Sequence, residues 1–244
     1  MCSETEDDSS TAVITIYGKE LQEVQSFKYL GRRLAAEGDE EEEIKHKIQT
    51  ARGVMATLSR PLYKRVGCAT KTKLAVFLAV TRTQLMFGCE TWCLVEAEWA
   101  KLQSLEMQGL RRILGWRGRM TDQGIRYPAN AEVWKEIQKI RQIDPIRQAV
   151  EKRQLAWWGR ILRMGPNALA KTALLSRMPG PSYVGWQRPR TLVPRLRKLV
   201  DRAGLVEEAV WERDKWTAGA ENLSQLQAPA KPSTSAAMPH PGAP

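Results

Sequence analysis

The amino-acid sequence predicts a mainly α-helical protein, with a small β-hairpin remnant near the N-terminus, a helical bundle after it and basic helices toward the C-terminus. Three observations lead to this fold class. β-branched and aromatic residues are concentrated in one short N-terminal stretch. Apolar residues then recur at the three- and four-residue spacing of a helix. Gly and Pro interrupt that spacing at a few points, where helices are expected to end.

The N-terminal stretch is expected to form three short strands. Residues 13–17 (Val-Ile-Thr-Ile-Tyr) are rich in β-branched side chains, and Gly18 with Lys19 after them suits a two-residue hairpin loop that opens with glycine. Residues 21–24 would be the return strand, and residues 27–31 (Phe-Lys-Tyr-Leu-Gly) a third strand. Strands this short bury too little surface alone, so we expect them to pack against helices.

Six helices are expected after the strands. The first begins at Asp39, which has Glu42 three residues later in the pattern of a capping box, and it stops at Pro61. Residues 115–124 are expected to be a basic loop, and residues 180–189 an extended Gly- and Pro-rich linker. The stripes of the six helices cover residues 44–58, 74–88, 99–113, 133–140, 146–161 and 193–200.

These elements divide the chain into five segments. Residues 1–12 are polar and acidic, and we expect them to be a disordered leader. The hairpin remnant covers residues 13–34, and a helical bundle covers residues 35–115. A basic helical region follows over residues 116–217. The Pro-, Ala- and Ser-rich tail over residues 218–244 is expected to be disordered.

Charge is distributed unevenly along the chain. The formal net charge is +11, with 38 Lys or Arg against 27 Asp or Glu. Residues 1–43 hold four Lys or Arg and twelve Asp or Glu, so the remaining residues carry a net charge of +19. A basic body suits a polyanionic partner such as nucleic acid, or an anionic membrane surface. Because there is neither a secretory leader nor an apolar run long enough to span a membrane, we expect an intracellular protein of the nucleus or cytoplasm.

No complete catalytic or metal site is expected. Cys89 and Cys93 are spaced by one helical turn, but zinc needs four ligands, and both histidines are distant in sequence. The chain has no Gly-x-Ser-x-Gly elbow and no Gly-rich phosphate loop. Its one pair of adjacent aspartates, Asp7 and Asp8, lies in the polar leader, where no strand would hold it for two-metal chemistry. We therefore expect no cofactor, no small-molecule substrate and no membrane partner.

Nucleic-acid binding has the strongest support from the residues. Arg and Lys neutralise phosphates, and an exposed Trp stacks on bases, although we expect most of the nine Trp residues to lie in the core. The third of three basic clusters begins in the Gly/Pro linker, and we expect it to be the main phosphate-contacting strip. The clusters are Arg111, Arg112, Trp116, Arg117 and Arg119; Lys152, Arg153, Trp157, Arg160 and Arg163; and Trp186, Arg188, Arg190, Arg195, Lys198 and Arg202.

Several motifs in order resemble the non-LTR (LINE-type) retrotransposon reverse transcriptases. Residues 27–31 resemble the aromatic-Tyr-Leu-Gly strand that follows the palm of these enzymes, and Gly38 with the Glu43-Ile44 pair resembles the start of their helical thumb. Residues 87–92 (Phe-Gly-Cys-Glu-Thr-Trp) resemble the family's Tyr-Gly-x-Glu-Thr-Trp.

The resemblance continues to about residue 217. Residues 110–115 (Leu-Arg-Arg-Ile-Leu-Gly) resemble Leu-Arg-x-Ile-Leu-Gly. Residues 155–164 resemble Leu-x-Trp-x-Gly-His-x-x-Arg-Met, with Arg160 where His is usual. Residues 188–191 resemble Gly-Arg-Pro-x-Thr without its Gly, and residues 214–216 resemble the closing Asp-Arg-x-x-Trp with altered spacing.

This resemblance implies contact with RNA template, primer and target DNA during target-primed reverse transcription. It implies that the strand with Lys28, Tyr29 and Gly31 contacts the primer end, and that the bundle is thumb-like. The family's Tyr-x-Asp-Asp strand, and the separate Asp that joins it on the metal ions, lie upstream in a palm that is missing from this chain. Magnesium would be needed only by that palm. Asp7 and Asp8 do not replace it, because they lie too close to residue 27 and follow no aromatic residue.

The sequence therefore favours a truncated polymerase fragment that binds RNA or DNA, mainly through phosphates, without polymerase activity. One open alternative is a non-enzymatic helical module for protein interaction or assembly, whose apolar faces would pack against the missing palm and fingers polypeptide. Another is half of a polymerase that is complemented in trans. The expected nucleic-acid contacts are Lys28, Tyr29, Gly31, Arg111, Arg112, Arg153, Trp157, Arg160, Arg163, Arg188, Arg190, Arg195 and Lys198.

Overall fold

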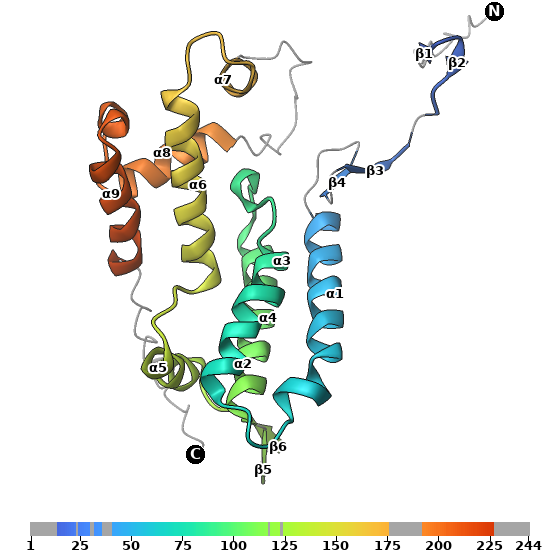
Figure 1. Cartoon of the computed structure of the whole chain (residues 1–244), viewed down its shortest axis with the longest axis vertical. Coiled ribbons are helices and arrows are strands. Elements are labelled where there is room, and N and C mark those ends of the chain that lie inside the picture. The colour runs from blue at the N-terminus through green and yellow to red at the C-terminus, as the bar shows by residue number, and fades with distance from the viewer. Residues whose placement is uncertain are drawn as a thin grey trace, which may run out of the picture. The chain divides into compact units, whose positions relative to one another are not determined.

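The computed structural model describes residues 14–22, 24–29, 32–35, 41–116, 118–122, 124–175 and 192–226. The chain divides into two units, Met1–Glu43 and Ile44–Pro244. Short antiparallel strands make up most of the described part of the first unit, and the second is built from helices with one further strand pair (Figure 1). The predicted fold class, mainly α with a small N-terminal β-hairpin remnant, is confirmed.

The N-terminal strands form two separate hairpins where the sequence predicts one three-stranded remnant. Strand β1 (Thr15–Ile16) pairs with β2 (Lys19–Glu20), and β3 (Ser26–Tyr29) pairs with β4 (Arg32–Ala35). The first turn consists of Tyr17 and Gly18, whose φ angles are +52° and +73°. Glycine is thus the second turn residue and not the first, because this type of hairpin turn needs a positive φ at both central positions.

Helices account for most of the remaining described chain. The six expected helices are found, the second of them as α2, η2 and α3 in succession. Pro61 does not simply end the first helix, because it lies within a π-helical turn that follows α1. In chain order the elements are α1 (Glu41–Thr57), η1 (Ser59–Tyr63), α2 (Thr70–Val76), η2 (Phe77–Arg82), α3 (Thr83–Leu85), η3 (Cys89–Thr91), α4 (Glu96–Leu114), β5 (Arg119–Thr121), β6 (Gly124–Arg126), α5 (Asn130–Ile140), α6 (Ile146–Arg163), α7 (Leu169–Leu175), α8 (Leu192–Arg202), η4 (Glu207–Trp211) and α9 (Arg213–Leu226).

The first hydrophobic core joins α1, α2, η2, α4 and α5 to the beginning of α6. It is closely packed at the crossing of η2 and α4, where a Cβ on Gly109 would lie 2.4 Å from Cε2 of Phe77. A side chain larger than hydrogen therefore does not fit there without movement of the aromatic ring. The largest fully buried side chains of this core include Ile44, Met55, Leu74, Trp92, Trp99, Leu102, Leu105, Leu110, Ile113 and Ile137.

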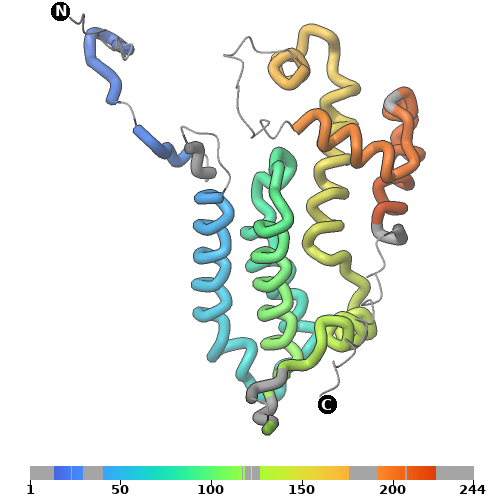
Figure 2. The backbone as a smooth tube through the Cα atoms, turned by 180° about the vertical axis from the view of Figure 1, so that it is seen from behind, coloured from blue at the N-terminus to red at the C-terminus, as the bar shows by residue number. Residues whose placement is uncertain are grey.

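A second core joins the C-terminal half of α6 to α8 and α9. Figures 1 and 2, which view the chain from opposite sides, show α6 as a long helix with α8 crossing one side of it. Trp216 of α9 packs closely against Gly159 of α6, and its indole N–H donates to the carbonyl of Leu155 at 2.9 Å. Helix α6 thus contributes to both cores, Val150 to the first and Trp158 to the second.

Two boundaries differ from the sequence-based expectation. The basic loop expected over residues 115–124 contains strand β5 and the start of β6, which pair with Thr121 opposite Gly124. Helix α9 continues to Leu226, although the tail was expected to begin at residue 218. Its later turns are ordered because Ala220 and Leu223 follow Trp216 at helical spacing and are buried in the second core.

The leader at residues 1–12, the linker at residues 180–189 and the helix start at Asp39 lie outside the described residues. Within the described part of the chain, no helix combines the length and the apolar composition that crossing a lipid bilayer requires.

Candidate nucleic-acid interface

The carboxylates of the helical unit affect the electrostatics of the candidate interface. Several of them are buried and paired with cations inside the fold. Glu106 of α4 is only 3% exposed and lies 3.3 Å from the guanidinium of Arg82. It also accepts a hydrogen bond from the backbone N–H of Ile146 at 2.9 Å. Burial raises the pKa of Glu106, and Arg82 and the Ile146 N–H oppose that rise. This carboxylate therefore orients α6 and contributes no surface charge.

Glu151 of α6 is also a buried carboxylate that holds helices together. It is 1% exposed and accepts a hydrogen bond from Arg202 of α8 at 2.7 Å, with Arg147 at 3.5 Å. Arg147 also forms two hydrogen bonds of 2.8 Å with Glu96 of α4, and these bonds lower the pKa of Glu96. The network links α4, α6 and α8. Arg202 therefore holds α8 to α6 through its ion pair with Glu151.

Arg195, a predicted phosphate contact, also faces the protein. Its guanidinium lies 5.5 Å from the ring centroid of Trp99, over which Arg147 lies at 5.4 Å, and it donates to the carbonyl of Leu94 at 2.9 Å. Lys198, three residues further along α8, is exposed. The predicted strip on α8 therefore divides into Arg195 and Arg202, which hold the helix in place, and Lys198, which is open to a ligand.

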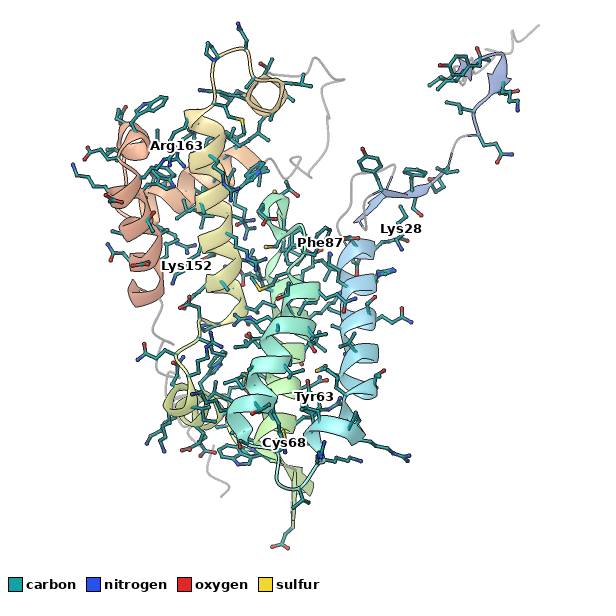
Figure 3. All side chains as sticks on the ribbon, viewed as in Figure 1. Lys28, Tyr63, Cys68, Phe87, Lys152 and Arg163 are labelled. Atoms are coloured by element: carbon teal, nitrogen blue, oxygen red, sulfur yellow. The ribbon has the colours of Figure 1, made fainter. Side chains whose placement is uncertain are left out.

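Two other predicted contacts hold connecting segments. Arg111 donates to the carbonyl of Pro128 at 3.0 Å and bonds the side chain of Asn130, so it secures the segment before α5. Arg163 donates to the carbonyl of Val210 at 2.8 Å and secures η4 against the end of α6. In Figure 3, Arg163 lies beside the upper end of α6.

The exposed side of α6 brings three of the predicted contacts together. Arg153 and Arg160 are exposed, and Trp157 between them is half-buried against the second core. Positions 153, 157 and 160 recur at four- and three-residue spacing and so share one helix face. Arg153 has a long hydrogen bond, 3.5 Å, to the carbonyl of Met86, and its side chain also lies near the thiol of Cys89. We call Arg153, Trp157 and Arg160 the α6 stripe.

The tryptophans largely follow the expectation of core packing. Trp92, Trp99, Trp158 and Trp216 are buried, and Trp211 is the exposed one among the described tryptophans, with 66% of its surface accessible. Trp116, Trp134 and Trp157 are partly buried against the two cores.

The N-terminal contacts belong to the other unit. Lys28 and Tyr29 lie on β3, and both are exposed, Tyr29 by 58%. Gly31, Arg188 and Arg190 lie outside the described residues.

The cysteines are not arranged as the helical spacing suggested. Cys89 begins the 3-10 turn η3, and the chain from Trp92 to Val95 is not helical, so Cys89 and Cys93 are not on successive turns of a helix. Burial, and to a smaller extent the negative charge of nearby Glu90, raises the pKa of the Cys89 thiol to about 11. The described residues contain no group of three or more His, Cys, Asp or Glu that could hold a metal ion.

A further set of cations was missed by the sequence reasoning. Between Ile44 and Cys89 the chain has no Asp or Glu and nine Lys or Arg. Each predicted basic cluster contains a Trp, and this stretch contains no Trp. Its lack of Asp and Glu is the sequence signal that would have revealed it. The members that are exposed and form no ion pair within the described part of the chain are Arg52, Arg60, Lys64, Arg65 and Lys71.

Comparisons of this chain with protein-family models, with curated proteins and with solved structures found no match.

Proposed function

We propose that this chain binds RNA or DNA through backbone phosphates, with little sequence preference, and that it does not polymerise nucleotides on its own. The proposal rests first on the net charge of +19 that residues 44–244 carry. Glu106 and Glu151, each 3% exposed or less, engage Arg82, Arg147 and Arg202 inside the fold, and the basic sequence still leaves an excess of Arg and Lys for the surface.

The α6 stripe is the part of this surface best suited to a nucleic acid. Its two guanidinium groups can each bind a phosphate, and the partly exposed ring of Trp157 lies between them, where a base could stack. Guanidinium contacts with phosphate carry little sequence information, which is why we propose binding without strong sequence preference. The resemblance to non-LTR retrotransposon reverse transcriptases supports the same class of partner.

The absence of polymerase activity is proposed from the sequence. The resemblance begins after the palm, and Asp7 and Asp8 lie in the acidic leader, outside the described residues. Polymerases hold two metal ions on carboxylates that are fixed by strands. Primer extension by the purified chain with magnesium should therefore give no product, and any product would refute this part of the proposal.

A gel-shift titration over salt concentration tests the binding. The wild-type chain should bind mixed-sequence RNA and duplex DNA at low salt, and the affinity should fall steeply between ~50 and ~200 mM salt. The double variant R153Q/R160Q should lower the slope of log affinity against log salt by about 1.8, since each lost phosphate contact contributes about 0.9 on duplex DNA.

The matched control is K135Q/R141Q, which removes the same charge from exposed positions on and just after α5. Its slope should stay close to that of the wild type. No binding at low salt would refute the proposed function, and equal slopes for the two double variants would remove the α6 stripe from it.

A second candidate function, protein interaction or assembly, is favoured by the N-terminal hairpins. Isolated two-stranded hairpins are marginal in water, and the described strands and turns there expose Ile14, Ile16, Tyr17, Phe27 and Tyr29, each by half or more. Light scattering separates the two candidates, because an assembly module predicts self-association of the purified chain, and a nucleic-acid binder predicts a monomer.

A further inference from the structure

The acid-free stretch from Ile44 to Cys89 contributes cations of two kinds. Four of its nine are engaged: Lys45 has a partner of its own, Lys47 lies 5.5 Å from the ring centroid of Phe87, Lys73 donates to the carbonyl of Tyr63 at 2.9 Å, and Arg82 pairs with Glu106. The cations that remain at the surface are not needed for those contacts. Their placement therefore calls for a separate explanation.

The structure gathers most of these surface cations at one end of the helical unit. Arg60 belongs to η1, Lys64 and Arg65 follow it directly, and Lys71 lies in the first turn of α2. The hydrogen bond from Lys73 to the carbonyl of Tyr63 ties α2 back to η1, so the two segments are held together. Figure 3 marks this end of the bundle by Tyr63 and Cys68, away from Phe87.

Helix α4 adds a further cation from a distant part of the sequence. Burial raises the pKa of Tyr63, while the nearby Thr81 side chain and the positive charge of Arg112 act in the opposite direction. Arg112, exposed on the last turn of α4, is therefore close enough to influence the Tyr63 hydroxyl. We call Arg60, Lys64, Arg65, Lys71 and Arg112 the η1 end.

Helix stability does not account for this arrangement. A cation in the last turn of α4 suits the negative end of the helix dipole, but Lys71 lies in the first turn of α2, where positive charge is unfavourable. Arg60, Lys64 and Arg65 form no ion pair within the described residues. Five neighbouring cations repel one another, and an anionic ligand would relieve that repulsion.

We propose that the η1 end is a second nucleic-acid contact, separate from the α6 stripe, which binds successive phosphates of one backbone. This inference rests on the proposed function and names a surface that supplies much of the positive charge for binding phosphates. Arg provides three of the five cations and binds phosphate in a bidentate manner.

A nucleic acid fits this surface better than an anionic membrane does. Membrane-surface binding combines basic residues with a buried apolar face. From residue 44 to residue 76, Val66 is the one large hydrophobic side chain that is exposed, at 98%. A single valine offers little area for insertion into lipid, whereas the surrounding cations match a line of phosphates.

The test compares two variants of equal charge change in the full chain. R60Q/K64Q/R65Q/K71Q removes four cations from the η1 end, and K135Q/K139Q/R141Q/K215Q removes four from α5, its C-terminal flank and α9. Each is titrated with the same mixed-sequence DNA duplex over a range of salt concentrations. Thermal melting by circular dichroism should show both variants folded, since all eight side chains are exposed.

The η1-end variant should lower the salt slope by about 3.6, at about 0.9 for each lost phosphate contact, and weaken binding by about tenfold or more near 0.1 M salt. The control variant should retain a near wild-type slope. A wild type that binds, with the two variants alike, would overturn this inference and leave the proposed function standing. A wild type that does not bind DNA or RNA overturns both. Binding to vesicles of anionic lipid without binding to nucleic acid would also overturn it.

Discussion

The contact between Gly159 and Trp216 offers a quantitative test of how α9 is held to α6. A Cβ built on Gly159 would lie 2.5 Å from Nε1 and 2.9 Å from Cε2 of the Trp216 indole. The ring is only 3% exposed and is fixed by its 2.9 Å hydrogen bond to the Leu155 carbonyl, so it has no room to move away freely. The substitution G159A should therefore push α9 away from α6.

The expected cost follows from three terms. Overpacking a well-filled core costs about 1–3 kcal/mol, and losing the buried indole hydrogen bond costs about 1–3 kcal/mol. Alanine in place of a helical glycine recovers about 1 kcal/mol. We therefore expect G159A to lower the free energy of unfolding by about 1–5 kcal/mol, with about 2–4 °C of melting temperature for each kcal/mol.

Gly53 of α1 provides the matched control, because a Cβ there would meet no atom within 4 Å. G53A should raise the free energy of unfolding by about 1 kcal/mol, since only the helix propensity changes. Urea denaturation followed by circular dichroism measures both variants. In a W216L background, where the smaller side chain leaves space, G159A should cost much less than in the wild type. A G159A variant as stable as the wild type, or one whose cost is unchanged by W216L, would refute this reasoning.

Two further predictions follow from buried ionisable groups. Because burial raises the pKa of Glu106 above its ordinary value of 4.5, the folded chain binds a proton more tightly than the unfolded chain, so Glu106 makes stability fall as pH rises from 4.5 through the raised pKa. Urea midpoints should fall with pH less steeply in E106Q than in the wild type over that window, and parallel curves would contradict the prediction. The thiol of Cys89, with its pKa raised to about 11, should react with a maleimide much more slowly than half-buried Cys68 in the folded chain. Mass spectrometry of labelled peptides measures the difference, and equal labelling of the two would contradict it.

The hydrophobic core was predictable from the sequence to a large extent. Trp99, Leu102, Leu105, Gly109 and Ile113 recur at helical spacing, and all five are buried on α4. A helix needs only its own repeat to place such residues on one face, so the pattern is local and can be read from the chain. The hairpins were harder, because which residues fill a two-residue turn depends on the backbone angles at Tyr17 and Gly18.

The nucleic-acid contacts were predictable in part. The α6 stripe follows from spacing on one helix, and the structure leaves Arg153 and Arg160 at the surface. The η1 end was not predicted as one surface. Arg112 was assigned to the cluster with Trp116, whereas Arg60, Lys64, Arg65 and Lys71 lie in a stretch without Trp, and only the folded chain brings the last turn of α4 close to that stretch.

By itself the sequence determined that this chain is helical, that its body is basic and where most helices lie, because these properties depend on composition and on short-range repeats. Only the tertiary structure decided which cations are free to meet a ligand. Arg195 and Lys198 lie on the same short helix and look equivalent in sequence, yet the first packs over Trp99 and the second faces solvent. The difference arises because the partner of each face of α8 is set by residues about a hundred positions away, such as the Leu94 carbonyl that Arg195 binds.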